Sequence, residues 1–506
     1  MSDSTASEPE SDFVCSCQEW MRSACSGEPF YREYQGRRYC VLHLPETQKS
    51  VDFSKAIETK LAAKDFNFRG VWFPAELRLD NYEFLDNVDF SGTFFNSRVF
   101  ITDTRFTIDA NFSGATFAKE AYFTRSVFNA KASFQRTTFR DHAYFSAATF
   151  RAVLFFKDAT FEASLDFAWA TCLGPVNFST ITLKLWATFQ NATFRDKAAF
   201  TNTSFNEADF RWTTFQSLGT FNNLRFKREA DFTGSQFLGE LDFNNVMFEA
   251  TASFKSALFG DRVRFAGEER RPVFMKASAL DLQFARTEKP DRVFFHTLCL
   301  HPHWFIHVDP RGFEFINVDW NNSGKAKLEL ELLKKKNVAS PHRLLAIASR
   351  RLAANAEDND RYREASHFRR MALDSERLAT WCGFDFRKLN WWYWIASGYG
   401  ERPFQALMVL MGILVLFGML YTRIGFARWE PKLASEVDSI VAKPDEVGAP
   451  LNIKRALTYS GGVMTLQKPE PKPATVTAQA LVLAETILGP VQAALLALAL
   501  RRKFMR

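Results

Sequence analysis

The sequence lacks the features that mark a secreted protein or a familiar enzyme. Residues 1–13, MSDSTASEPESDF, are acidic and contain no apolar run, so we expect a disordered tail rather than a signal peptide. The chain has no Gly-rich phosphate loop, no H-E-x-x-H and no G-x-S-x-G. These absences argue against the enzyme classes that depend on such motifs, and we predict no catalytic site.

A strong charge of one sign is also missing from the middle of the chain. The 506 residues carry a formal net charge of +7, but the 21 acidic and 21 basic side chains between residues 68 and 265 cancel. A protein that imitates DNA needs a strong negative field, and one that binds nucleic acid needs a dense basic stripe. The sequence therefore predicts no nucleic-acid partner. A mixed-charge surface suits the binding or spacing of proteins, although it does not name the partner.

Cysteine is scarce, and its count of seven is odd. An odd number argues against a disulfide framework and favours a reducing compartment with a metal site or free thiols. Cys15, Cys17, Cys25, Cys40 and His43 lie in a polar segment that is too short to fold by burial alone. The Cys-x-x-His pair is a zinc half-site, and Cys25 with either Cys15 or Cys17 would complete four ligands. We predict one structural zinc ion, with free or redox-active thiols as the alternative.

Phenylalanine is abundant, with 54 copies, and its spacing is regular. Steps of five and six residues alternate, which gives a true period of 11 and matches neither a helix nor a heptad. The series runs from Phe68 to Phe265, loses one residue between Phe205 and Phe210, and has Cys172 in one Phe position, where we expect a buried thiol. Its clearest members are Phe112, Phe117, Phe123, Phe128, Phe134, Phe139, Phe145, Phe150, Phe156 and Phe161.

A fixed short period indicates identical structural units stacked on one another. A small side chain precedes most of these phenylalanines by two residues, and in extended backbone both point to the same side. This pattern resembles the pentapeptide-repeat proteins. The resemblance implies a mainly β fold, a right-handed quadrilateral parallel β-helix with an aromatic or Leu at the centre of each face. A similar Cys/His cap precedes the repeats in proteins of this kind.

The alternating steps depart from a strict five-residue repeat. They give about 22 residues per coil instead of 20, so two corners in each coil should carry an extra residue, as a small bulge. Residues 68–265 would then form about nine coils. Beyond Phe265 the spacing loosens, and we expect wider terminal coils that close the apolar end.

Helical spacing replaces this pattern in residues 340–378. Two apolar stretches with helical periodicity flank the sequence NAEDND, which we interpret as a linker between antiparallel helices. Ser340 before Pro341 is a favourable helix start. The pair is similar to a single tetratricopeptide-like unit, and we expect it to couple the β-helix to a membrane domain.

Two long apolar runs follow, residues 404–421 and 477–500. Each is long enough to cross a bilayer as a helix. The aromatic cluster at 391–394, WWYW, precedes the first run and is typical of a membrane interface. This cluster disfavours the alternative, a buried hairpin in a soluble protein.

Basic residues flank both runs on the side of the chain termini. They are Arg387, Lys388 and Arg402 before the first run, and Arg501, Arg502, Lys503 and Arg506 after the second. Positive charge marks the cytoplasmic side. We therefore expect a multi-pass protein of a bacterial-type inner (cell) membrane with both termini cytoplasmic and the connecting loop outside.

The second run resembles the inner helix of two-span, potassium-channel-like pore domains. Glu485 near the outer end, Gly489 one turn on and the basic tail carry this resemblance. Where such proteins have a Thr-Val-Gly-Tyr-Gly-like filter, this chain has Thr465 and Leu466 followed by Gln-Lys-Pro, so any pore is degenerate. Glu485 is either functional or a packing residue satisfied at the helix boundary.

Two functions follow from these patterns. The first is a membrane-tethered cytoplasmic scaffold for protein–protein interaction, and the second is a channel-like homo-oligomer that is gated by the repeats. The expected divisions are a tail at 1–13, a Cys/His cap at 14–60, the β-helix at 61–321, a helical linker at 322–390 and a membrane domain at 391–506 with an external loop at 422–476.

Overall fold

The computed structural model describes residues 13–25, 27–268, 273–275, 278–320, 326–379, 387, 389–424, 426–427 and 451–504, with the backbone alone at residue 503. The predicted tail, apart from Phe13, lies outside these residues, as do Lys388 and Arg506. The chain divides into two compact units, residues 1–323 and 324–506. Each unit is described by itself.

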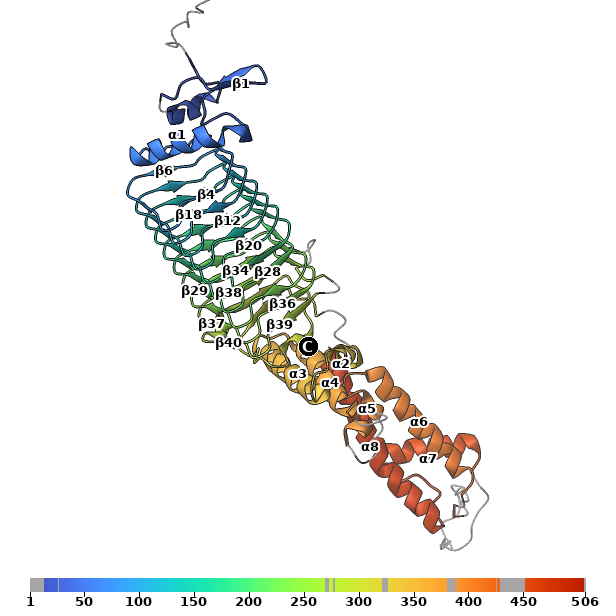
Figure 1. The fold of residues 1–506 in the computed structure, drawn as a ribbon. Helices are drawn as coiled ribbons and strands as arrows, with labels where there is room; N and C mark the ends of the chain where they lie inside the picture. Colours follow the sequence, from blue (N-terminus) through green and yellow to red (C-terminus); the bar gives the residue numbers. More distant parts are fainter. Residues whose placement is uncertain are drawn as a thin grey trace, which may run out of the picture. The chain divides into compact units, whose positions relative to one another are not determined.

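The first unit is a parallel β-helix built from very short strands (Figure 1). Each strand pairs with the strands four places earlier and later, as β10 (Ala110–Asn111) does with β6 (Val88–Asp89) and β14 (Ala132–Ser133). Ala110 pairs with Ala132, so one coil is 22 residues and the predicted fold is confirmed. The four parallel sheets of the described residues contain 9 to 11 strands each. They run from β3 (Trp72–Phe73) to β35 (Met247–Phe248), β4 (Leu77–Arg78) to β39 (Ala279–Asp281), β5 (Glu83–Phe84) to β40 (Arg286–Thr287), and β6 to β42 (Glu314–Ile316).

The alternating steps reflect two kinds of corner. In the five-residue corners, apart from the one between Phe205 and Phe210 where the repeat loses a residue, the second residue after the inward side chain has a positive φ, as at Asn81 (59°) and Asp103 (55°). The Tyr82 amide donates to the Leu79 carbonyl across this corner at 3.2 Å, which is the pattern of a type II turn. Within residues 68–260, all of which are described, the six-residue corners contain no such residue. The shorter corner is therefore a tight turn with one left-handed residue, and the longer corner accommodates its extra residue without one.

The phenylalanines fill the interior of the coils. The ten side chains of the clearest stretch are 0–1% exposed. Rings one coil apart stack almost parallel, with centroids 4.9 Å apart for Phe112 and Phe134, and 4.8 Å for Phe117 and Phe139. Rings from different faces meet edge-on, as Phe112 and Phe123 do at 85°. The core therefore combines offset stacks along the axis with edge contacts across it.

The buried Cys172 interrupts one of these stacks, and its neighbour adapts. Phe150 and Phe194 would lie on either side of a ring at position 172. The Phe167 ring instead stacks on both, with centroid distances of 5.8 Å and 6.3 Å and interplanar angles of 7° and 3°. The small thiol thus leaves room that a ring from the adjacent face occupies.

A helix closes the N-terminal end of the coils (Figure 1). Helix α1 (Ser50–Ala62) places Phe53 edge-on against Phe73 of the first coil at 5.2 Å. It follows the short helices η1 (Glu19–Cys25) and η2 (Thr47–Lys49) and the hairpin of β1 (Arg32–Tyr34) and β2 (Arg37–Tyr39). Gly70 has φ +65°, and a Cβ there would lie 2.2 Å from Met21 Sδ. Glycine at this corner therefore allows the cap to sit directly on the coil.

The coils widen after Phe265, as predicted. Strand β38 (Val263–Ala266) pairs with β41 (Val293–His296), with Val263 opposite Val293, thirty positions later. The helices η3 (Pro290–Arg292) and η4 (Pro302–Phe305) lie in this part of the chain. Phe305 packs edge-on against Phe295, at 5.7 Å, and against Trp320, at 5.9 Å. Aromatic side chains therefore fill the last coils.

The second unit is helical. The predicted pair is α3 (Pro341–Asp358) and α4 (Tyr362–Arg377), preceded by α2 (Ala326–Lys335), which the sequence reasoning missed. Two details were wrong. Most of NAEDND belongs to α3, because its Ala and Asn residues continue the helical packing, and Ser340 has φ 54° and makes no side-chain cap hydrogen bond.

The remaining helices are α5 (Leu389–Ser397), α6 (Pro403–Tyr421), α7 (Ile453–Met464) and α8 (Val476–Phe504). Helices α6 and α8 are long and apolar enough to cross a membrane, and most of their surface is exposed. Helix α7 lies in the connection that we expected to be a loop, of which residues 428–450 are outside the described part.

Candidate functional site

Four cysteines and one histidine converge in the N-terminal cap. The donor atoms of Cys15, Cys17, Cys25 and His43 all lie within 4.8 Å of one another. Cys40 Sγ lies 3.9 Å from Cys25 Sγ and 3.2 Å from His43 Nδ1. Ligands about 2.3 Å from a tetrahedral zinc ion lie about 3.8 Å apart, so these spacings suit a metal. The five thiol and imidazole donors are one more than such an ion requires.

The other nitrogen of the His43 ring is held by the first coil. His43 Nε2 lies 2.9 Å from the Arg69 carbonyl oxygen, and Nδ1 faces Cys25 Sγ at 3.4 Å. A metal-binding histidine usually donates its second N–H to a carbonyl or carboxylate, which fixes the ring and its tautomer. The arrangement therefore fits a bound metal, and it would link the cap directly to the β-helix.

Two buried lysines support the cap, and the sequence reasoning missed both. Lys49 Nζ donates to the carbonyls of Val41 and Leu42 at 2.6 Å and 3.0 Å. Burial lowers the pKa of this ammonium to about 7. Lys60 Nζ, also buried, pairs with Asp65 at 2.5 Å. Lys49 ends η2 and Lys60 lies in α1. The polar sequence around them gives no sign that either side chain is buried, because a lysine in such a sequence is normally solvated.

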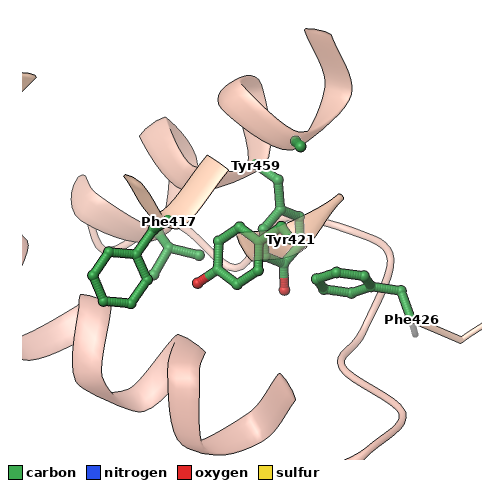
Figure 2. Packing of buried hydrophobic residues seen from close by; sticks show 6 residues of the cluster. Phe417, Tyr421, Phe426 and Tyr459 are labelled. Atoms are coloured by element: carbon green, nitrogen blue, oxygen red, sulfur yellow. The ribbon is translucent and has the colours of Figure 1, made fainter. Parts of the chain in front are cut away.

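In the second unit, Glu485 of α8 lies inside a polar and aromatic cluster. Its carboxylate accepts hydrogen bonds from Tyr421 Oη of α6, at 2.5 Å, and from Ser460 Oγ of α7. Figure 2 shows the Tyr421 and Tyr459 rings between Phe417 and Phe426. Glu485 thus joins the two candidate spans to the helix between them.

Gly489 lies against the end of α7. A Cβ at this position would lie 2.9 Å from Met464 Cγ and 3.0 Å from Met464 Cα, so the glycine permits close packing of α8 on α7. One turn further along α8, Gln492 Nε2 donates to the carbonyls of Ala396 and Ala406 at 2.7 Å and 2.8 Å. Sequence reasoning missed Gln492, although an amide in the middle of an apolar run is a recognisable signal.

The comparisons with known proteins agree with the geometry of the coils. A family model described as pentapeptide repeats in nine copies matches residues 79–127 and 189–236. These segments lie within the stacked coils. The β domain is a pentapeptide-repeat domain. No curated protein and no solved structure matches the chain. The pentapeptide-repeat solenoid is a structural, scaffold type of fold and not a known enzyme family.

The surface charges of the pentapeptide-repeat domain pair between neighbouring coils. Arg125 Nη2 lies 2.7 Å from Asp103, and Lys184 Nζ lies 2.9 Å from Glu162. Each of these pairs joins positions 22 residues apart, which the coil places side by side. Exposed pairs contribute little to stability, but they leave no field of one sign across the surface.

Large apolar side chains are exposed on one face of the pentapeptide-repeat domain. Trp169 (64% exposed) and Trp212 (57%) occupy the same corner two coils apart, and Trp186 lies on the strand between them, β24 (Trp186–Thr188). Leu185 beside Trp186 is also exposed. We call these four residues the tryptophan face. The sequence contains a signal for it, because Trp169 and Trp212 each follow an inward Phe by two residues.

Proposed function

We propose that this chain is a membrane-anchored scaffold whose pentapeptide-repeat domain binds another protein. The tryptophan face is the observation that supports this proposal most directly. Exposed Trp is uncommon on a soluble surface and is enriched at the centres of protein interfaces. The neutral, paired charges around it oppose a nucleic-acid partner. The proposal gives the domain no catalytic role.

Site-specific photocrosslinking of the full chain in its native membrane tests this proposal. A photoreactive residue at position 169 or 212 should capture the same protein. A matched probe at the exposed Ile108, at a different corner of an earlier coil, should not capture it. Equal labelling at all three positions would reject the tryptophan face as the binding surface.

We place the protein in the inner membrane, with α6 and α8 as its two spans and both termini in the cytoplasm. The basic residues at the start of α6 and the end of α8 support this orientation. Reporter fusions at residue 506 and within residues 428–450 measure the orientation. We expect a cytoplasmic signal at the first site and an external signal at the second, and the reverse pattern would overturn the topology.

The cap, by this proposal, holds one structural zinc ion. Four of the five donors would bind it, and the ion would fix the loops that precede α1 against the first coil. Metal analysis of the full chain should give about one zinc per chain. Cys25→Ser, which removes the thiol that lies near Cys17, Cys40 and His43, should lower this ratio, whereas Cys299→Ser should not. If the thiols are free and hold no metal, the parent chain and both variants should all contain no zinc.

A second candidate function is a degenerate, channel-like pore formed by several copies. Helix α7 favours it, because its 12 residues are too few to span a bilayer and it lies in sequence between two helices that can. Its Ser460 is tied to Glu485 of α8. Planar-bilayer recording and the oligomeric mass in detergent test this candidate. A monomer without conductance would exclude it and leave the scaffold proposal intact.

A further inference from the structure

A cationic cavity lies where α4 approaches the start of α6 and the end of α8. Its volume is about 750 Å³. Arg363 of α4, Arg402 before α6 and Arg502 of α8 line it, with Glu401 as the one carboxylate among its lining residues. Three guanidinium groups and one carboxylate give the cavity an excess of positive charge.

Among the residues that the structure describes, two of these arginines have no counterion. Arg502 Nη1 donates to the Tyr399 carbonyl at 3.0 Å and lies 3.9 Å from Glu401. Arg363 and Arg402 are exposed and form no ion pair within the described residues. Guanidinium groups bind phosphate through paired, charge-assisted hydrogen bonds. The cavity therefore has free donors for an anion.

Ser366 provides an independent sign of a ligand. This residue lines the same cavity and is only 6% exposed, and its Oγ has no hydrogen-bond partner in the described part of the chain. A buried hydroxyl without a partner is unfavourable, because it has lost its water and gained nothing in return. In addition, α6 begins at Pro403 in the cavity wall, and the positive end of a helix dipole favours an anion.

We propose that this cavity binds the phosphate of an anionic phospholipid headgroup. Phe404, in the first turn of α6 and in the cavity lining, is 73% exposed and is suitably placed to contact an acyl chain. The cavity also lies at the ends of both spans, which is where headgroups gather. This inference rests on the proposed membrane anchor, because a lipid reaches the cavity only if α6 and α8 span the bilayer.

Native mass spectrometry of the full chain in a nonionic detergent tests the inference. Delipidated protein is mixed with phosphatidylglycerol or with phosphatidylcholine, and the retained lipid is counted. We expect one phosphatidylglycerol per chain and little phosphatidylcholine. The double variant Arg363→Gln/Arg402→Gln should bind phosphatidylglycerol about thirtyfold more weakly, since each arginine near a headgroup contributes about 1 kcal/mol and about 1.4 kcal/mol corresponds to a factor of ten.

Two further variants separate binding from folding. Arg423→Gln removes one positive charge beyond the opposite end of α6 and should leave retention unchanged. Ser366→Ala should weaken retention without lowering the melting temperature, because its hydroxyl has no partner within the described residues.

Three results would overturn the inference. These are equal retention of the two lipids, unchanged retention in the double variant, and displacement of phosphatidylglycerol by millimolar inorganic phosphate, which would make free phosphate the ligand. Reconstitution into neutral nanodiscs separates this failure from that of the anchor. If the chain inserts but shows no preference for anionic lipid, only the lipid-binding inference is rejected. If the chain does not insert, the proposed membrane anchor is rejected as well.

Discussion

The pentapeptide-repeat domain and the two candidate spans contain similar apolar side chains but place them in opposite directions. In the coils, each of the ten repeat phenylalanines of the clearest stretch points inward and stacks on an equivalent ring one turn away, as Phe112 does on Phe134. In α6 and α8, most apolar side chains face outward, and the contacts among the helices include polar groups such as Glu485 and Gln492. The coils can therefore fold in water, whereas the spans need lipid or further chains to cover them.

A charge placed inside the coils is the strongest test of this difference between inward and outward side chains. Phe156→Asp buries an unpaired carboxylate and should destabilise the domain by more than about 4 kcal/mol. Phe155→Asp, one residue earlier and only partly buried, is the matched control and should cost about 1 kcal/mol or less. Thermal unfolding followed by circular dichroism measures both. Equal effects at the two positions would show that inward and outward faces do not differ.

The second prediction concerns the polar interior of the helical unit. Glu485→Ala leaves the Tyr421 hydroxyl without its acceptor and the Ser460 hydroxyl with only the Leu414 carbonyl, and should cost roughly 1–3 kcal/mol. Glu485→Gln keeps an acceptor and should cost less. Leu483→Ala, at an outward position of the same helix, should have almost no effect in detergent. If Leu483→Ala were as damaging as Glu485→Ala, apolar contacts would dominate this unit as they do the coils.

The third prediction concerns the irregular stack in the coils. Cys172→Phe restores the repeat pattern but should destabilise the domain by about 1–3 kcal/mol, because Phe167 already fills the space. Cys172→Ala should cost less than this. Denaturant unfolding of the two variants measures the difference. A stabilised Cys172→Phe protein would show that Phe167 returns freely to its own stack.

Alkylation provides a check on the same site. Burial raises the pKa of the Cys172 thiol, so the thiol stays protonated and unreactive in the folded domain. Iodoacetamide should label it only after the coils unfold. Labelling under native conditions would contradict a closed core at this position.

The last prediction is a pH dependence of the cap. The folded pKa of Lys49 is about 7, against its usual 10.5, so between these values the unfolded chain binds a proton that the folded cap does not. Cap stability should therefore rise with pH across this window, by at most about 1.4 kcal/mol per pH unit, while below pH 7 the contribution is constant. Hydrogen exchange of residues 14–60 between pH 7 and 9 measures the slope. Lys49→Met should reduce the slope of cap stability against pH. If the slope is unchanged in this variant, the pH dependence comes from the cysteines and not from Lys49.

The sequence by itself determined the coil and the spans. Both depend on local rules. A period of 11 residues directs a phenylalanine into the interior at every fifth or sixth position. An uncharged run such as residues 404–421 can satisfy its backbone hydrogen bonds in lipid only as a helix. The same reasoning located Cys15, Cys17, Cys25, Cys40 and His43 in one short segment. It left open how many of them meet, because that depends on the loops between them.

Only the tertiary structure decided the contacts between elements that are distant in sequence. His43 meets the Arg69 carbonyl, Phe167 fills the space beside Cys172, and Glu485 accepts from helices 25 and 64 residues away. The cavity lined by Arg363, Arg402 and Arg502 is of the same kind. Periodicity fixes which way a side chain points from its own strand or helix, but the angle and depth at which two elements pack fix what that side chain touches.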